Sequence, residues 1–243
     1  MARARERLGY SDVRAFLDRF WIVFSTVTSQ AGLPVAPRPF PFKIVYLDHE
    51  QSRVIVSLKS PLHLKNWPYK AASSGTPNLH IIVDARETID IQKSKIVHSW
   101  VQVIYYEEKP LGEDSLLPIE SIHYDYKAIP AQAHPVFHAQ FCHEVISDDN
   151  KNRVETLRNF TILNDSFGDR YRHLKIPTAH MNLISVLLSL CADHIPTRVS
   201  ASRLKDLFEG VSKIRRMPTV EAESLSNSIR NTGSYCSMYW YVT

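Results

Sequence analysis

The chain has 243 residues, of which 44% are hydrophobic and 22% charged, as in ordinary soluble globular proteins. A chain of this length buries roughly 70–75% of the surface of its unfolded form, so it needs no metal or disulfide merely to fold. The formal charge of +4 is far below that of proteins with dense Lys/Arg stripes, so it permits a nucleic-acid partner without predicting one.

The cysteines and the apolar segments predict a cytoplasmic protein. Cys142, Cys191 and Cys236 are odd in number, far apart and without a CxxC pair, which disfavours both a disulfide framework and a thiolate zinc site. Residues 1–10 are basic and lack the apolar core of a signal peptide. The apolar window 181–192 is too short to span a bilayer, so we expect no membrane association.

An amphipathic helix is predicted over residues 10–28, with Ser11 as its N-cap. Its apolar face consists of Val13, Phe16, Leu17, Phe20, Phe24 and Val27. The proline-rich stretch 33–42 cannot continue a helix and predicts extended backbone.

Six segments rich in β-branched and aromatic residues predict strands of a mostly antiparallel sheet. They are residues 42–48, 53–59, 79–85, 95–107, 119–127 and 135–145. In the fourth segment the core face is formed by Val97, Ser99, Val101, Val103 and Tyr105.

Three further helices are predicted after the sheet. Thr178 is placed to cap a helix that runs to His194 and is apolar around most of its circumference, which predicts burial. Ser200 is placed to cap a second helix that ends near Gly210, and Thr219 to cap a third.

The elements together predict a single α+β domain over residues 1–243. Its sheet has about six mostly antiparallel strands, with an N-terminal helix and C-terminal helices packed on one face. An internal division between the sheet and the C-terminal helices would fall near residues 147–153, which are polar and charged.

Residues 123–141 hold the densest group of candidate functional side chains, HYDYKAIPAQAHPVFHAQF. Side chains alternate across strands, so pairing of the two strands in this stretch sorts them into two sets. The set predicted in the core is Tyr124, Tyr126, Phe137 and Phe141. The set predicted together on the opposite face is His123, Asp125, His138 and Gln140.

The polar set of this stretch has three interpretations. Two imidazoles with a carboxylate suit general acid–base catalysis, because histidine titrates near neutral pH and a carboxylate fixes its tautomer. The same groups suit a divalent metal. A solvated sheet surface, on which cross-strand polar pairs have no chemical role, is the third interpretation.

Two other groups are candidate binding residues. Arg170, Arg172 and the helix start at Thr178 can present cations and free N–H groups to an anion, although a surface connector with internally paired charges is the favoured interpretation. The aromatic segment 234–243 offers Tyr239, Trp240 and Tyr241 to a protein partner.

Several catalytic motifs are missing from the sequence. It contains no G-x-x-x-x-G-K-[ST], G-x-G-x-x-G, G-x-S-x-G or H-E-x-x-H, and it has only seven glycines. P-loop nucleotide hydrolysis, Rossmann redox chemistry and serine hydrolysis are therefore disfavoured, and no particular cofactor is predicted.

The combination YDY followed by HPVFHAQF resembles a strand pair in uncharacterised bacterial proteins of defence and toxin–antitoxin loci. In those proteins an arginine often stands at the position of His123. The resemblance implies a bacterial cytoplasmic protein that takes part in antiviral defence or a toxin system.

Two functions are predicted. The first is a non-catalytic accessory subunit that binds a protein partner through the open sheet face or the aromatic C-terminal segment. The alternative is a small RNA- or nucleotide-directed enzyme that uses His123 and His138 as acid and base, oriented by Asp125 and with or without a metal.

Overall fold

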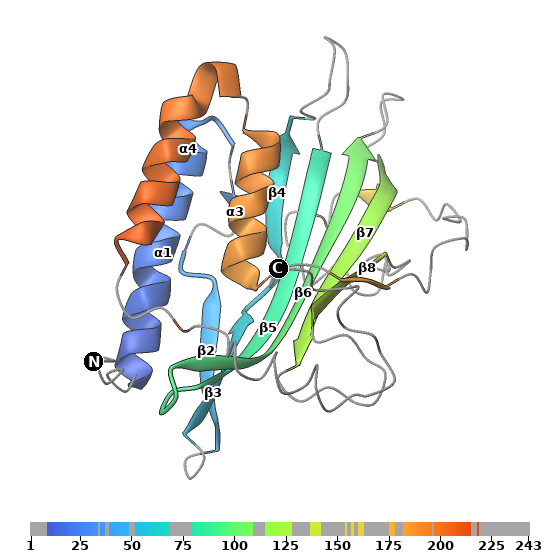
Figure 1. Ribbon diagram of the computed structural model, residues 1–243. Coiled ribbons are helices and arrows are strands. Elements are labelled where there is room, and N and C mark those ends of the chain that lie inside the picture. The colour runs from blue at the N-terminus through green and yellow to red at the C-terminus, as the bar shows by residue number, and fades with distance from the viewer. Residues whose placement is uncertain are drawn as a thin grey trace.

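A long twisted sheet forms the centre of the computed structural model, and three helices pack against one of its faces (Figure 1). The predicted α+β architecture with a mostly antiparallel sheet is confirmed. The structure describes residues 9–33, 35–36, 39–48, 52–68, 79–108, 115–127, 137–141, 154, 157, 160–162, 175–177, 182–195, 197–214 and 218.

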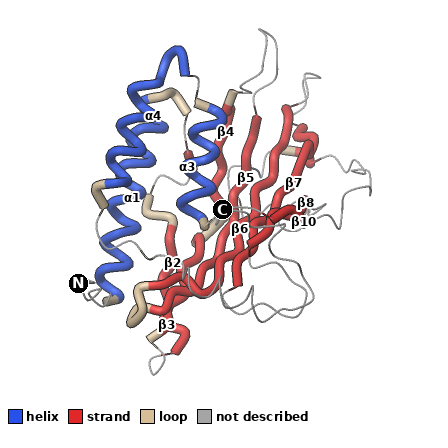
Figure 2. The backbone as a smooth tube through the Cα atoms, viewed as in Figure 1, coloured by secondary structure: helices blue, strands red, loops and turns tan. Residues whose placement is uncertain are grey.

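The described strands form one sheet, whose pairings are antiparallel except for that of β9 with β7 (Figure 2). Its main path runs through β1 (Val35–Ala36), β4 (Leu62–Trp67), β5 (Leu79–Asp90), β6 (Lys95–Glu108), β7 (Ser115–Lys127), β8 (Phe137–Phe141) and β10 (Lys175–Pro177). Off this path, β2 (Phe42–Asp48) pairs with β3 (Arg53–Leu58), β3 with β5, and β9 (Thr161–Ile162) with β7.

All six predicted strands are present, as β2, β3, β5, β6, β7 and β8, and the structure adds β1, β4, β9 and β10. One edge of β5 pairs with two strands: β4 lies along one half of this edge and β3 along the other half. The break between these two partners contains Pro61, which has no N–H to donate to a ladder. A single long strand is thereby divided into two.

Helix α1 spans Tyr10–Gln30 and buries the predicted apolar face. Its N-cap is Gly9, whereas the sequence prediction placed Ser11 there. The Gly9 N–H donates to Oδ2 of Asp12 at 2.8 Å, so a carboxylate in the first turn reaches back to the chain before the helix. The helix consequently begins before the serine.

Helix α3 spans Leu183–His194 and is buried as predicted, but it does not begin at Thr178, which lies outside the described residues. Asn182 is the N-cap, because its Oδ1 accepts the Ser185 N–H at 2.8 Å. Glu87 of β5 accepts the Leu183 N–H at 2.8 Å and the Ser99 hydroxyl at 3.1 Å. The start of α3 is thus held by a buried carboxylate of the sheet; burial raises the pKa of Glu87.

Helix α4 spans Thr197–Ser212, so its predicted start at Ser200 is wrong, whereas its predicted end near Gly210 agrees with the observed end. Ser200 lies inside the helix and is not its cap. Gly210 lies in the last turn of the helix, where α4 passes close to α1. A Cβ at this position would lie 2.8 Å from Cγ1 of Val23. The predicted helix from Thr219, the 234–243 segment and the 147–153 division lie outside the described residues.

Two groups of buried apolar side chains occupy opposite faces of the sheet. The larger core lies between the helices and the sheet and includes Phe20, Phe24, Trp67, Val83 and Val101. The smaller core, which we call the outer core, consists of Ile82, Ile104, Tyr106, Leu116, Val154, Leu157, Phe160 and Ile162. Only part of the face opposite the helices is therefore covered by described residues.

Candidate functional site

The register of the ladders aligns polar and aromatic residues from six strands in one row across the face opposite the helices. This polar row consists of Lys43, Ser57, Arg86, Trp100, Asp125 and His138, each the Cα partner of the next. A neighbouring row consists of Asp84, Gln102, His123 and Gln140. Because side chains alternate along each strand, members of one row share a face.

The structure contains the strand pairing predicted for residues 123–141. His123 is the Cα partner of Gln140, and Asp125 is the Cα partner of His138, so all four positions share one face. Tyr126 lies on the opposite face and is 1% exposed. The predicted core residue Phe141 is half-buried, and the side chains of Phe137 and His138 lie outside what the structure describes.

His123 and Asp125 form a close pair within β7. Their Nε2 and Oδ2 atoms are 3.1 Å apart, and the two side chains are only 20% and 17% exposed. The ring of Trp100 lies edge-on to the imidazole, with 6.2 Å between ring centroids. A carboxylate this close to an imidazole can fix the tautomer and the orientation of the ring. The pair thus has the residue types of a general base and of the carboxylate that orients it.

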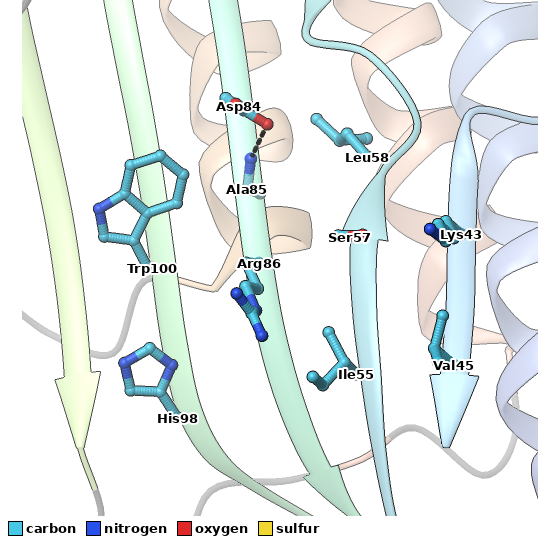
Figure 3. A pocket seen from close by; sticks show the side chains of 10 residues that line it. All are labelled: Lys43, Val45, Ile55, Ser57, Leu58, Asp84, Ala85, Arg86, His98 and Trp100. Carbon is cyan, nitrogen blue, oxygen red and sulfur yellow. Dashed lines mark hydrogen bonds between the residues drawn. The ribbon is translucent and has the colours of Figure 1, made fainter. Parts of the chain in front are cut away.

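A cavity of about 630 Å³ opens beside this pair, over β2, β3, β5 and β6 (Figure 3). Lys43, Arg86 and His98 supply its basic side chains, and Trp100 supplies an aromatic ring. Its acidic lining residue is Asp84, whose Oδ1 accepts the Ala85 N–H at 2.9 Å. The volume falls within the range of small-molecule sites.

The sequence interpretation did not identify this cavity. Lys43, Arg86 and Trp100 lie on three predicted strands, but each is an ordinary residue in its own segment. Their alignment depends on the register of β2 with β3, β3 with β5, and β5 with β6. No local signal in the sequence specifies that register, so only a pairing prediction could have found the site.

A second histidine pair lies under the outer core and was also missed. Nε2 of His63 and Nδ1 of His80 are 3.0 Å apart, and the residues are 1% and 0% exposed. The Phe160 ring lies 5.1 Å from that of His80, centroid to centroid. Burial lowers the pKa of His63 to about 3 and also lowers that of His80, so both rings are neutral at pH 7.

Other candidate groups do not form a site in the described part of the chain. Cys191 is buried, and burial raises the pKa of its thiol to about 12, so it is not a ready nucleophile. Among the described residues, no group of three or more His, Cys, Asp or Glu side chains is arranged to hold a metal ion.

The remaining predicted site residues lie outside the described ranges. These are Arg170, Arg172 and Thr178 of the anion site, and Tyr239, Trp240 and Tyr241 of the partner surface. In the described parts of the chain, no helix combines the length and the apolar character needed to cross a membrane.

The chain was compared with protein-family models, with curated proteins and with solved structures. None of the three comparisons found a significant match.

Proposed function

We propose that the protein is an enzyme acting on a phosphate ester of a nucleotide or RNA, with His123 as the general base and Asp125 as the group that orients it. The 3.1 Å approach of these two side chains carries this proposal. Both belong to β7, a long strand paired on both sides, so the pair sits on a rigid element.

The charge beside the pair favours an anionic substrate. Lys43 and Arg86 are exposed on the same face, and neither forms an ion pair with another described residue. Cations in such positions attract phosphate, and an arginine can hold two of its oxygens at once. In this proposal Lys43 on β2 and Arg86 on β5 bind the phosphate, and His123 and Asp125 on β7 form the acid–base pair.

The proposed reaction is a phosphoryl transfer that needs one base and one acid. Nδ1 of His123 takes the proton of an attacking hydroxyl, whose oxygen forms a new bond to phosphorus. The bond from phosphorus to the leaving oxygen breaks, and that oxygen receives a proton from a general acid. His138, the register partner of Asp125, is the residue we assign as this acid.

The test is cleavage of a fluorophore-labelled RNA by wild type, His123→Gln, Asp125→Asn and the control Asp206→Asn. Asp206 is an exposed residue of α4, on the helix side of the sheet. We expect His123→Gln to lose about 10²- to 10⁴-fold in rate, as removal of a general base usually does. Asp125→Asn should lose less, and the control nothing.

Equal cleavage by all four folded proteins would refute the assignment of the pair. A folded wild type without activity on RNA or nucleotides would refute the enzymatic proposal and favour the accessory protein-binding role. One observation supports the protein-binding role. Among the described strands β2 pairs only with β3, and it exposes Val45, Tyr46 and Leu47, so a partner could pair with its other edge. In either role, we propose that the protein takes part in a bacterial defence or toxin system, as the resemblance of residues 123–141 implies.

A further inference from the structure

The cavity beside the His123–Asp125 pair has a fixed order of chemical groups. Along the polar row Lys43 lies on β2, Ser57 on β3, Arg86 on β5 and Trp100 on β6. Neighbouring strands are about 4.8 Å apart, so Lys43 and Arg86 start about 10 Å from each other. Figure 3 shows these side chains on the face turned away from the helices.

The two ends of the row differ in the ligand group they suit. Lys43 and Arg86 are both exposed cations and suit phosphate oxygens. Trp100 is half-buried, and its indole suits a planar ring, because every base has a π-face on which an aromatic side chain can stack. A ligand that satisfies both ends carries an anionic group and an aromatic ring.

The position of the tryptophan links this cavity to the proposed reaction. Trp100 is the Cα partner of Asp125 in the next strand, and its ring contacts that of His123. A base stacked on the tryptophan therefore lies beside the acid–base pair. Its phosphate extends toward Arg86 and Lys43.

The lining disfavours other ligand classes. A purely apolar ligand would desolvate Lys43 and Arg86 without offering them a partner, which costs free energy. A metal cation would meet the like charges of Lys43 and Arg86 and, among the described lining residues, a single carboxylate, that of Asp84. A simple anion would need only the cations and would leave the tryptophan unused.

We propose that this cavity binds one nucleotide unit, with the base on Trp100 and the phosphate held by Arg86 and Lys43. This inference rests on the proposed function, because it assigns the substrate class of the same face. Free nucleotides and RNA ends share this chemistry.

Isothermal titration calorimetry of the His123→Gln protein tests the cavity, because His123 is not one of the lining residues and its replacement should slow turnover. The probes are AMP, adenosine, inorganic phosphate and a short oligoadenylate RNA. We expect AMP to bind about tenfold or more tightly than adenosine or phosphate. If the oligoadenylate binds more tightly than AMP, the natural ligand is RNA. If it binds more weakly, the natural ligand is a free nucleotide.

Substitutions in the cavity, made in the His123→Gln protein, distinguish the residues that bind the phosphate from the residue that binds the base. Arg86→Ala and Lys43→Ala should each weaken AMP about ten- to hundredfold and leave adenosine unchanged. Trp100→Leu should weaken AMP and adenosine but not phosphate. Lys205→Ala is the control, because Lys205 is 73% exposed on α4.

Equal affinity for AMP and phosphate, unaffected by Trp100→Leu, would overturn the nucleotide assignment, and so would absence of AMP binding. The two proposals fail separately. RNA cleavage by wild type without any effect of the cavity variants overturns this inference alone. AMP binding by a protein that cleaves nothing overturns the proposed reaction alone.

Discussion

At the scale of single residues, His63 and His80 show how burial decides the charge of a side chain. The two imidazoles share a hydrogen bond of 3.0 Å in which one ring donates and the other accepts. Desolvation is the largest cause of the lowered pKa of both rings, and the nearby Lys65 lowers them further. Glu108 acts in the opposite direction on His80, whose Nε2 lies 3.7 Å from Oε2 of that residue.

This pair predicts a loss of stability in acid. Because the pKa of His63 is about 3 in the folded protein and near 6.5 when unfolded, the unfolded chain binds more protons between these values. The stabilisation is complete above pH 6.5 and is lost as the pH falls toward 3. The expected slope for one such group is about 1.4 kcal/mol per pH unit.

Urea unfolding of wild type and His63→Gln across this pH window checks the prediction. Glutamine keeps a polar group near the position of Nε2 but does not titrate, so the free energy of unfolding of the variant should fall less steeply with decreasing pH. If the free energy of unfolding of both proteins fell equally steeply with decreasing pH, the histidine pair would not be the cause of the loss of stability in acid.

At the scale of elements, the close packing of α1 and α4 depends on a residue without a side chain. A Cβ on Gly210 would lie 2.8 Å from Val23, closer than atoms in a relaxed structure approach. The same two helices are joined by a hydrogen bond from Arg203 to Gln30. The absence of a side chain at Gly210 therefore permits the close approach of α1 and α4.

Gly210→Ala tests this packing against intrinsic helix propensity. Propensity alone would stabilise the helix by roughly 0.5–1 kcal/mol, whereas overpacking costs about 1–3 kcal/mol. We expect a net destabilisation in denaturant unfolding. The double variant Val23→Ala, Gly210→Ala should recover part of the loss, because the shorter side chain removes the clash. A stabilised Gly210→Ala protein would show that the helices separate readily.

At the scale of the whole molecule, the sheet carries unequal cores on its two faces. The helix side holds the larger core, while the outer core covers one part of the opposite face and leaves the cavity open beyond it. Phe160 belongs to the outer core and also covers the His63–His80 pair through its contact with His80. The backbone of the sheet separates the two cores, so we expect them to open independently.

Hydrogen–deuterium exchange of Phe160→Ala and Phe20→Ala checks this independence. Truncating a buried phenylalanine costs about 3–5 kcal/mol. In Phe160→Ala we expect faster exchange at the Phe160 position and Leu157, with β5 and β6 still protected. Phe20→Ala, which alters the larger core, should instead lower protection throughout the sheet. Identical exchange patterns would indicate one cooperative core.

Features of the fold and the site that depend on neighbouring residues in the chain could be predicted from the sequence, and features that depend on distant residues could not. Strand identity and the two sets of side chains within residues 123–141 depend on alternation along the chain, and the observed pairing agrees with it. Strand β4 was missed because LHLKNW mixes apolar and polar residues and contains Asn66 at φ 59°. The caps of α1 and α3 were misplaced because Asp12 and Asn182 supply the capping oxygens that the sequence interpretation assigned to Ser11 and Thr178.

The sequence by itself determined the α+β class, the six main strands, the burial of α3 and the common face of His123 and Asp125. These features follow from hydrophobic period and alternation, which each segment carries within itself. Only the tertiary structure decided which strands are neighbours and in what register. That decision aligned Lys43, Arg86 and Trp100 beside the pair and buried His63 against His80, because such contacts join residues far apart in the chain.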